Sequence, residues 1–229
     1  MRVRWLVAAI AVLAVASYLD NVALPSAYPW ISVVWVLVLL VLARAAGLTA
    51  ADLGLARSTW RRGLRWAFVA AGLVLVVYLL ALVLPAGRDA FLDQRARLGP
   101  GGALFAAFVS VPVGTVLLEE VAFRGVVWGM VARLRGPVWA TGVSSVLFGL
   151  WHVLPSLRLG RANELVGSVY GSAAGVALTT SAVLATVLAG LVLAALRRRS
   201  GSLLAPIGLH WATNALGYLI GAAIWTVSG

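Results

Sequence analysis

Seven long apolar runs, separated by short segments that carry arginine, proline or glycine, leave this chain few ways to fold. A helix needs about 20 apolar residues to cross the hydrocarbon core of a bilayer, and 62% of the 229 residues are hydrophobic, with a mean hydropathy of +1.01. The sequence therefore predicts an all-α, polytopic transmembrane helical bundle that forms one domain over residues 1–229. The expected spans are residues 5–18, 30–46, 67–86, 103–131, 138–152, 166–196 and 203–227.

The distribution of the 18 basic residues, all of them arginine, indicates how these spans are oriented. Cytoplasmic loops of membrane proteins are enriched in Lys and Arg. With the N-terminus inside, twelve arginines fall in cytoplasmic segments and five in outer loops, while Arg124 lies within the membrane. This asymmetry favours seven spans with the N-terminus inside. An eighth span is the alternative, but splitting residues 166–196 in two would place Arg197, Arg198 and Arg199 outside.

Composition also bears on partners and location. The net charge of +11 does not indicate a nucleic-acid partner, because the arginines lie between apolar runs and not on one groove-binding face. The absence of Cys excludes disulfides and thiolate sites. The absence of Lys beside abundant Ala, Gly, Val and Arg is typical of a GC-rich bacterial genome, so we expect the bacterial cytoplasmic membrane. We expect the first helix to be retained, although Ala14-Val15-Ala16 has the form of a signal-peptidase site.

Residues 47–66 separate the second and third spans and have a different character. They carry Arg57, Arg61, Arg62 and Arg65 together with two tryptophans. Basic residues and tryptophan in an amphipathic pattern favour a helix that lies on the membrane surface. A solvated loop is the alternative that the sequence leaves equally open.

The stretch LLEEVAFRGVVWGM, residues 117–130, places three charged residues in an otherwise apolar span. A charged residue at the bilayer centre costs at least about 2.5–3.5 kcal/mol on insertion scales, so it is rarely kept without a role. Glu120 and Arg124 are four residues apart and share a helix face, which predicts an ion pair. Glu119 points away from that pair. We therefore expect Glu120 and Arg124 to be mainly structural and Glu119 to be the carboxylate that is free for chemistry.

Two further apolar spans carry the two histidines of the chain. Phe148 and His152 are four residues apart in the fifth span, and His210 and Asn214 are four apart in the last one. Each pair projects from one helical face. By residue count, these polar side chains lie at depths that agree with that of Glu119 to within about 10 Å. The sequence therefore predicts that the polar residues of three spans line one intramembrane cavity.

These motifs, in this order and on separate spans, resemble those of the CPBP family. The family comprises the type II CAAX prenyl proteases and their bacterial relatives, the bacteriocin-processing and Abi-type membrane proteins. The elements that match are Glu119-Glu120-x-x-x-Arg124, Phe148-x-x-x-His152 and His210-x-x-x-Asn214. The resemblance covers residues 103–219, about half of the chain, as a family-like protease core.

The resemblance implies an intramembrane endopeptidase that acts on a membrane-associated protein or peptide. By analogy with the family, Glu119 and His152 would activate a water molecule, and His210 and Asn214 would stabilise the oxyanion. Glu120, Arg124 and Phe148 would support them. Glu119, His152 and His210 could also ligate zinc, although no H-E-x-x-H helix is present. We favour a metal-independent mechanism and leave zinc open.

Two other functions compete with proteolysis at this stage. The first is a non-catalytic membrane protein of the same family, such as an immunity or scaffold factor that kept the motifs. The second is a proton-coupled transporter, in which buried Glu, Arg and His would form an ion pathway. The sequence shows no internal repeat that would support a transporter. Proteolysis is the interpretation that uses all of the motif residues.

Overall fold

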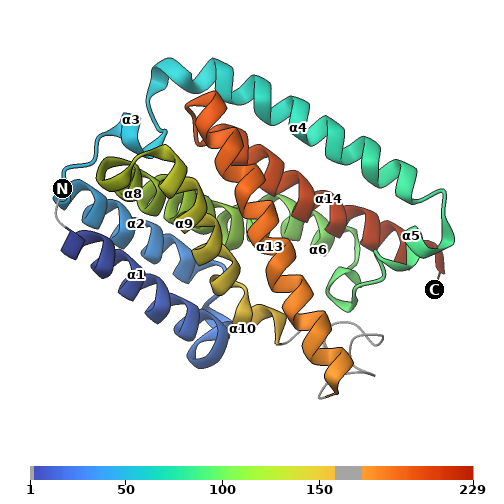
Figure 1. Cartoon of the computed structure of the whole chain (residues 1–229). Helices are drawn as coiled ribbons and strands as arrows, with labels where there is room; N and C mark the ends of the chain where they lie inside the picture. The colour runs from blue at the N-terminus through green and yellow to red at the C-terminus, as the bar shows by residue number, and fades with distance from the viewer. Residues whose placement is uncertain (1–2, 158–171, 229) are drawn as a thin grey trace.

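The chain is a bundle of long helices, as Figure 1 shows. The computed structural model describes residues 3–157 and 172–228, and within them it contains no strand. Five of these helices are long and apolar enough to cross a membrane, namely Val3–Ala23, Ala50–Ala81, Pro100–Arg135, Pro137–Ser156 and Ala174–Ser200. A shorter apolar helix covers Trp30–Ala45. The predicted helical membrane bundle is thus confirmed.

The helices follow the predicted apolar runs closely. The α-helical elements are α1 (Val3–Tyr18), α2 (Trp30–Ala45), α3 (Ala50–Leu53), α4 (Trp60–Ala81), α5 (Pro85–Asp89), α6 (Pro100–Phe105), α7 (Leu117–Glu119), α8 (Trp128–Arg135), α9 (Pro137–Trp151), α10 (Val153–Ser156), α13 (Ala173–Ser200) and α14 (Leu204–Ser228). Each of the seven expected spans overlaps at least one of them. The first residues of the sixth expected span, 166–171, lie outside the described residues.

The first helix is longer than expected. The polar turn predicted from residue 20 begins only after Ala23, because Leu19–Ala23 continues α1 as a π-helical turn. Asp20 at this turn accepts a hydrogen bond from Trp35 Nε1 at 2.9 Å. This contact between consecutive helices satisfies the carboxylate and lets the helical backbone extend past it.

The helix predicted over residues 47–66 is wrong as a single element. The Thr49 side chain and the Asp52 side chain form a reciprocal capping box that starts the short helix α3. Gly54 then ends it in a left-handed conformation, with φ at +74°. After a 3₁₀ turn at Arg57–Thr59, residues from Trp60 onward belong to α4, so the third span starts seven residues before the expected position 67.

The charged segment over residues 87–102, which separates the third and fourth expected spans, contains regular turns and helix ends. It contains the end of α5, a 3₁₀ turn at Gln94–Ala96 and the start of α6. Trp225 of α14 anchors this segment through two contacts. Its Nε1 donates to the Asp93 carbonyl at 3.2 Å, and the Arg97 guanidinium lies 5.2 Å from its ring centroid. The segment therefore has a fixed place beside α14.

The fourth span is a continuous helical stretch, Pro100–Arg135, whose backbone widens twice. Pro112 has no N–H to donate and cannot complete a regular α-helical turn. Over Ala106–Val116 the helix has π-helical spacing, and the Leu117 N–H donates to the Pro112 carbonyl five residues before it. A second π-helical stretch covers Glu120–Val127. Glu119 and Glu120 lie at the junction of these stretches, near the middle of the span.

Apolar side chains cover both the inside and the outside of the bundle. Inside, Phe123, Val126 and Met130 of the fourth span are at most 1% exposed. Outside, large apolar side chains are widely exposed, including Val41, Phe68 and Leu188. A surface of this kind is stable only against lipid or another apolar partner. The long helices α13 and α14 pack along α9 and α4 and hold the fourth span at the centre.

Candidate active site

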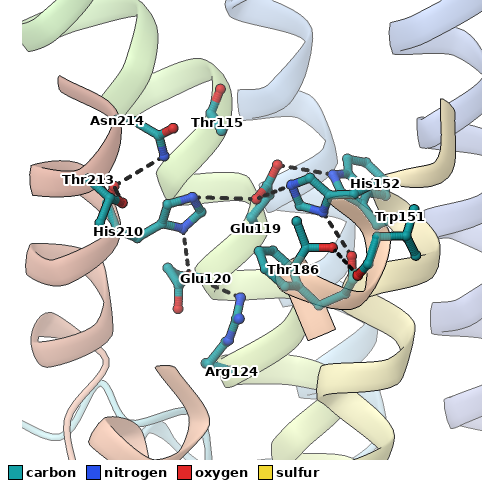
Figure 2. Close-up of polar contacts among 12 residues, drawn as sticks. Thr115, Glu119, Glu120, Arg124, Trp151, His152, Thr186, His210, Thr213 and Asn214 are labelled. Carbon is teal, nitrogen blue, oxygen red and sulfur yellow. Dashed lines mark hydrogen bonds and ion pairs between the residues drawn. The ribbon is translucent and has the colours of Figure 1, made fainter. Parts of the chain in front are cut away.

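Glu119 lies at the centre of the bundle and is only 6% exposed. One of its oxygens is held, because Trp151 Nε1 donates to Oε1 at 3.0 Å. Trp151 comes from the end of α9, so this hydrogen bond ties the fourth and fifth spans together. Figure 2 shows the carboxylate between side chains of α9 and α14. The bond fixes the carboxylate and leaves Oε2 directed elsewhere.

The second oxygen of Glu119 faces two imidazole rings. Nε2 of His210 lies 3.6 Å from Oε2, and Nε2 of His152 lies 3.8 Å from it. Oε2 is buried and has no hydrogen-bond partner among the described residues. Both separations are longer than a hydrogen bond. The side chains of Glu119, His152 and His210 therefore meet at one point, as the sequence predicted.

Glu120 connects the neighbouring charges. Its Oε1 accepts a hydrogen bond from Arg124 Nη1 at 3.0 Å and contacts His210 Nδ1 at 2.7 Å. Glu120 and Arg124 are both fully buried. The predicted pair is therefore present, but it is not purely local, because the same oxygen also holds the ring of His210. Since a carboxylate can only accept, His210 Nδ1 carries the proton of that bond.

Phe148 forms the wall between these groups. The Arg124 guanidinium lies 3.9 Å from its ring centroid, which is a cation–π contact with a buried charge. The rings of His152 and His210 meet Phe148 edge-on, with centroids 4.5 and 6.0 Å away. Phe148 is 3% exposed. It therefore fixes the orientation of both histidines and shields the guanidinium from solvent.

Backbone carbonyls determine the remaining hydrogen bonds of the motif residues. His152 Nδ1 lies 2.8 Å from the Phe148 carbonyl oxygen, which can only accept. Nδ1 therefore donates, and in a neutral ring Nε2 is the acceptor that faces Glu119. Asn214 Nδ2 donates to the His210 carbonyl at 3.1 Å, one turn back on α14. Figure 2 shows this amide above the ring of His210, with its nitrogen turned toward its own helix. Asn214 thus lies beside the site without contacting the carboxylate.

A cavity of about 420 Å³ leads to Glu119 from one end of the bundle. Its inner wall contains Glu119, His152 and Asn214. A second cavity of about 300 Å³ is lined by His210 and again by His152 and Asn214. The first cavity is also lined by Asp20, Asn21, Tyr28, Arg95, Val111, Gly114, Thr115, Leu118, Trp151, Pro155, Ser156, Ala182, Thr186 and Tyr218. Its size suits a short peptide segment.

An ion pair lies at the mouth of the larger cavity. Arg95, which lines the cavity, binds Asp93 with Nη2 at 2.6 Å from Oδ2 and Nε at 3.0 Å from Oδ1. Burial alone would raise the pKa of Asp93, but the hydrogen bonds and positive charge of Arg95 hold it below its ordinary value. Asp93 therefore stays ionised around neutral pH, and the pair keeps a charged, hydrated rim over the site.

The sequence does not predict three residues of the site. Trp151 is the direct partner of Glu119, and its position beside His152 is the available signal. Arg95 lies between two expected spans, and nothing in the local sequence shows that this segment returns to the cavity. Thr186 of α13 lines both cavities. The predicted motif residues, by contrast, all lie in or next to the cluster.

The side chains that could hold a metal ion are Glu119, His152 and His210. They converge through Oε2 of Glu119 and the Nε2 atoms of the two histidines. Nδ1 of His210 contacts Glu120, and Oε1 of Glu119 accepts from Trp151. These outer contacts are compatible with metal ligation, although within residues 3–157 and 172–228 no three His, Cys, Asp or Glu side chains form a complete metal-binding group. No step below depends on a metal.

Comparison with known families identifies the central half of the chain. Residues 101–216 match the family model described as type II CAAX prenyl endopeptidase Rce1-like. The chain belongs to this family. The matched region contains all of the residues of the Glu–His cluster, together with the α13 side chains that line the cavities. No curated protein and no solved structure matches the chain.

Membership of the Rce1-like family has two direct consequences. The family is described by an endopeptidase, so at the level of the family the chain is a protease-type enzyme. Membership of this family, together with the five long apolar helices, identifies the chain as an integral membrane protein. The Rce1-like region begins at α6 and ends within α14, so α1, α2 and α4 are elements that the match does not cover.

Proposed function

We propose that the chain is an intramembrane endopeptidase that hydrolyses a peptide bond of a membrane-associated protein or peptide. One observation carries this proposal. Glu119 Oε2 is buried, lacks a hydrogen-bond partner among the described residues and faces Nε2 of His152 and of His210. A water molecule that reached Glu119 and His152 from the cavity would have a carboxylate to take its proton and an imidazole to orient it.

The reaction then follows from the positions of these groups. Glu119 removes a proton from the water, and the oxygen attacks the scissile carbonyl carbon to give a tetrahedral oxyanion. His152, with Nδ1–H bound to the Phe148 carbonyl, accepts a hydrogen bond from the water through Nε2. Collapse of the intermediate breaks the C–N bond, and the proton held by Glu119 passes to the leaving amine. The carboxylate returns to its ionised form, and no cofactor is consumed.

His210 is the group proposed to stabilise the oxyanion. Its Nδ1–H is bound to Glu120, so Nε2 can donate to an oxyanion only when the ring carries both protons. Asn214 would assist only after its amide turns away from the His210 carbonyl. Its contribution as an oxyanion donor is thus secondary to that of the histidine.

The proposal extends to location and partners. We place the chain in a bacterial cytoplasmic membrane with its N-terminus inside, supported by the arginine distribution and the Lys-free composition. The partners are membrane lipid and the substrate. The family description names a prenyl endopeptidase, but the cavity residues identified above do not require a prenyl group, so we propose the bond chemistry without that substrate.

Cleavage should be visible in the termini of membrane proteins. Membranes of cells that express the chain should contain new protein N-termini that are absent from cells expressing the Glu119→Gln variant at the same level. Mass spectrometry of labelled N-termini measures this difference. Identical sets of termini, together with no cleavage of membrane peptides by the purified chain, would support a non-catalytic family member instead.

The metal question has its own test. If Glu119 activates water directly, activity should survive exhaustive chelation, and elemental analysis of the active protein should find no stoichiometric zinc. A zinc enzyme would lose activity on chelation and recover it when zinc is added back. Zinc content that follows activity through these steps would contradict the metal-independent mechanism while leaving the same residues in the site.

A further inference from the structure

The two ends of the bundle differ in arginine content. At one end, the starts of α1, α4 and α9 meet the ends of α2, α8 and α13, as Figure 1 shows. Arg133 binds Asp52, Arg197 donates to the Asp52 carbonyl at 3.0 Å, and Arg62 donates to the Ser200 carbonyl at 2.6 Å. The described arginines of this end are Arg4, Arg44, Arg57, Arg61, Arg62, Arg65, Arg133, Arg135, Arg197, Arg198 and Arg199.

The other end carries the cavity. Three of its segments supply cavity-lining residues: the turn after α1, the segment between α5 and α6, and helix α10. Tyr28 is 41% exposed, and the Arg95 side chain is 59% exposed, so the mouth is open to the surroundings at this end. The described arginines here are Arg88, Arg95 and Arg97.

Packed side chains separate the site from the arginine-rich end. Between Glu119 and Arg133, the fourth span contributes Phe123, Val127 and Met130, each at most 1% exposed. They belong to one continuous hydrophobic core that also includes Leu39 of α2. A water-filled route would need polar partners along its length, and beyond the buried pair of Glu120 and Arg124 these three apolar side chains offer none. The carboxylate is therefore reached from the arginine-poor end.

Resting on the proposed function, we infer that the active-site cavity opens to the non-cytoplasmic side of the membrane. Arginine-rich connections remain in the cytoplasm, where the anionic leaflet attracts basic residues. The end of the bundle that carries these arginines is the end that the apolar core separates from Glu119. The substrate is therefore a peptide segment at the outer face of the membrane, such as the juxtamembrane part of an exported protein, and not the C-terminus of a cytosolic protein.

The polar rim is consistent with such a substrate. Asn21 and Arg95 surround the mouth, and Tyr28 and Tyr218 complete it. These groups can bind the backbone N–H and C=O groups of an extended segment that arrives hydrated. A peptide at the outer face would meet this rim first and reach Glu119 without crossing the apolar core.

Single cysteines test this inference directly, because the chain contains none of its own. Ser26→Cys and Ser58→Cys form a matched pair, since both serines are exposed and lie in 3₁₀ turns at opposite ends of the bundle. Ala182→Cys places a third thiol in the cavity wall. The probe is a charged, membrane-impermeant maleimide applied to intact spheroplasts and to inverted membrane vesicles.

In intact spheroplasts, we expect labelling of the Ser26→Cys and Ala182→Cys variants, and labelling of Ser58→Cys only after lysis. In inverted vesicles, we expect labelling of Ser58→Cys and no labelling of Ser26→Cys or Ala182→Cys before lysis. Labelling of Ser58→Cys in intact spheroplasts would overturn the inference, and so would labelling of Ala182→Cys only from inverted vesicles. This result does not depend on activity. If labelling follows the expectation but no Glu119-dependent termini form, the proposed function fails and the orientation stands.

Discussion

Replacing Glu119 by Gln should lower the rate of peptide cleavage by about 10³-fold or more, because it removes the base while keeping the side-chain volume. The Gln carbonyl oxygen can still accept the hydrogen bond from Trp151 Nε1 that Glu119 Oε1 accepts now. The thermal midpoint in detergent should therefore stay close to that of the wild type. Cleavage rates of a membrane peptide, measured beside the thermal midpoint, check both parts of this expectation.

Asp20→Asn is the matched control for this experiment. Asp20 lines the same cavity as Glu119, but its partner is Trp35 Nε1, and it contacts neither histidine. An Asn oxygen can keep the bond to Trp35, so this variant should retain both its fold and its rate. A Glu119→Gln protein that cleaves at the wild-type rate would remove Glu119 from the reaction. Equal losses of cleavage rate in both variants would mean that the negative charge of the cavity matters and that Glu119 has no specific role.

Replacing Arg124 by Ala should mainly lower stability. The guanidinium is fully buried between Glu120 and the ring of Phe148. Breaking a buried ion pair by removing one partner costs about 3–5 kcal/mol, because the other charge is left uncompensated. We expect a thermal midpoint lower by roughly 10 °C and a reduced yield in detergent. Differential scanning fluorimetry of the purified variant measures the shift.

Arg198→Ala is the control for the loss of an arginine as such, since Arg198 is exposed at the end of α13. It should leave the thermal midpoint nearly unchanged, because exposed charges contribute little. Activity per folded molecule distinguishes the roles of Arg124. A variant with wild-type stability and no activity would place the guanidinium in the reaction and contradict its structural role.

Helix periodicity and depth were sufficient to predict the cluster. Residues four apart on apolar spans share a face, which brought Glu120 to Arg124 and placed Phe148 beside His152. Charges and histidines in apolar runs have few stable positions other than against one another. The meeting of Glu119 with the histidines therefore followed from composition and spacing alone. Their catalytic roles stay predictions.

Contacts between segments that are far apart in the sequence could not be predicted in this way. Trp151 reaches Glu119 only because of the angle at which α9 crosses the fourth span, and Arg95 reaches the cavity because Trp225 holds its segment. The break within residues 47–66 did have a local signal, since Thr49, Asp52 and Gly54 are typical helix-start and helix-end residues. The π-helical widening had only Pro112 to indicate it.

The contact of one glutamate oxygen with both Arg124 and His210 has a consequence for biogenesis. Chains are synthesised from the N-terminus, so the fourth span enters the bilayer before the helices that carry Trp151 and the two histidines. Glu120 and Arg124 can neutralise each other at once, because both belong to that span. Glu119 has no such neighbour and depends on later helices. Glu119 is thus the last charge of this span to find its partners, and α14, which follows the other described helices, completes the cluster only when the rest is already in the membrane.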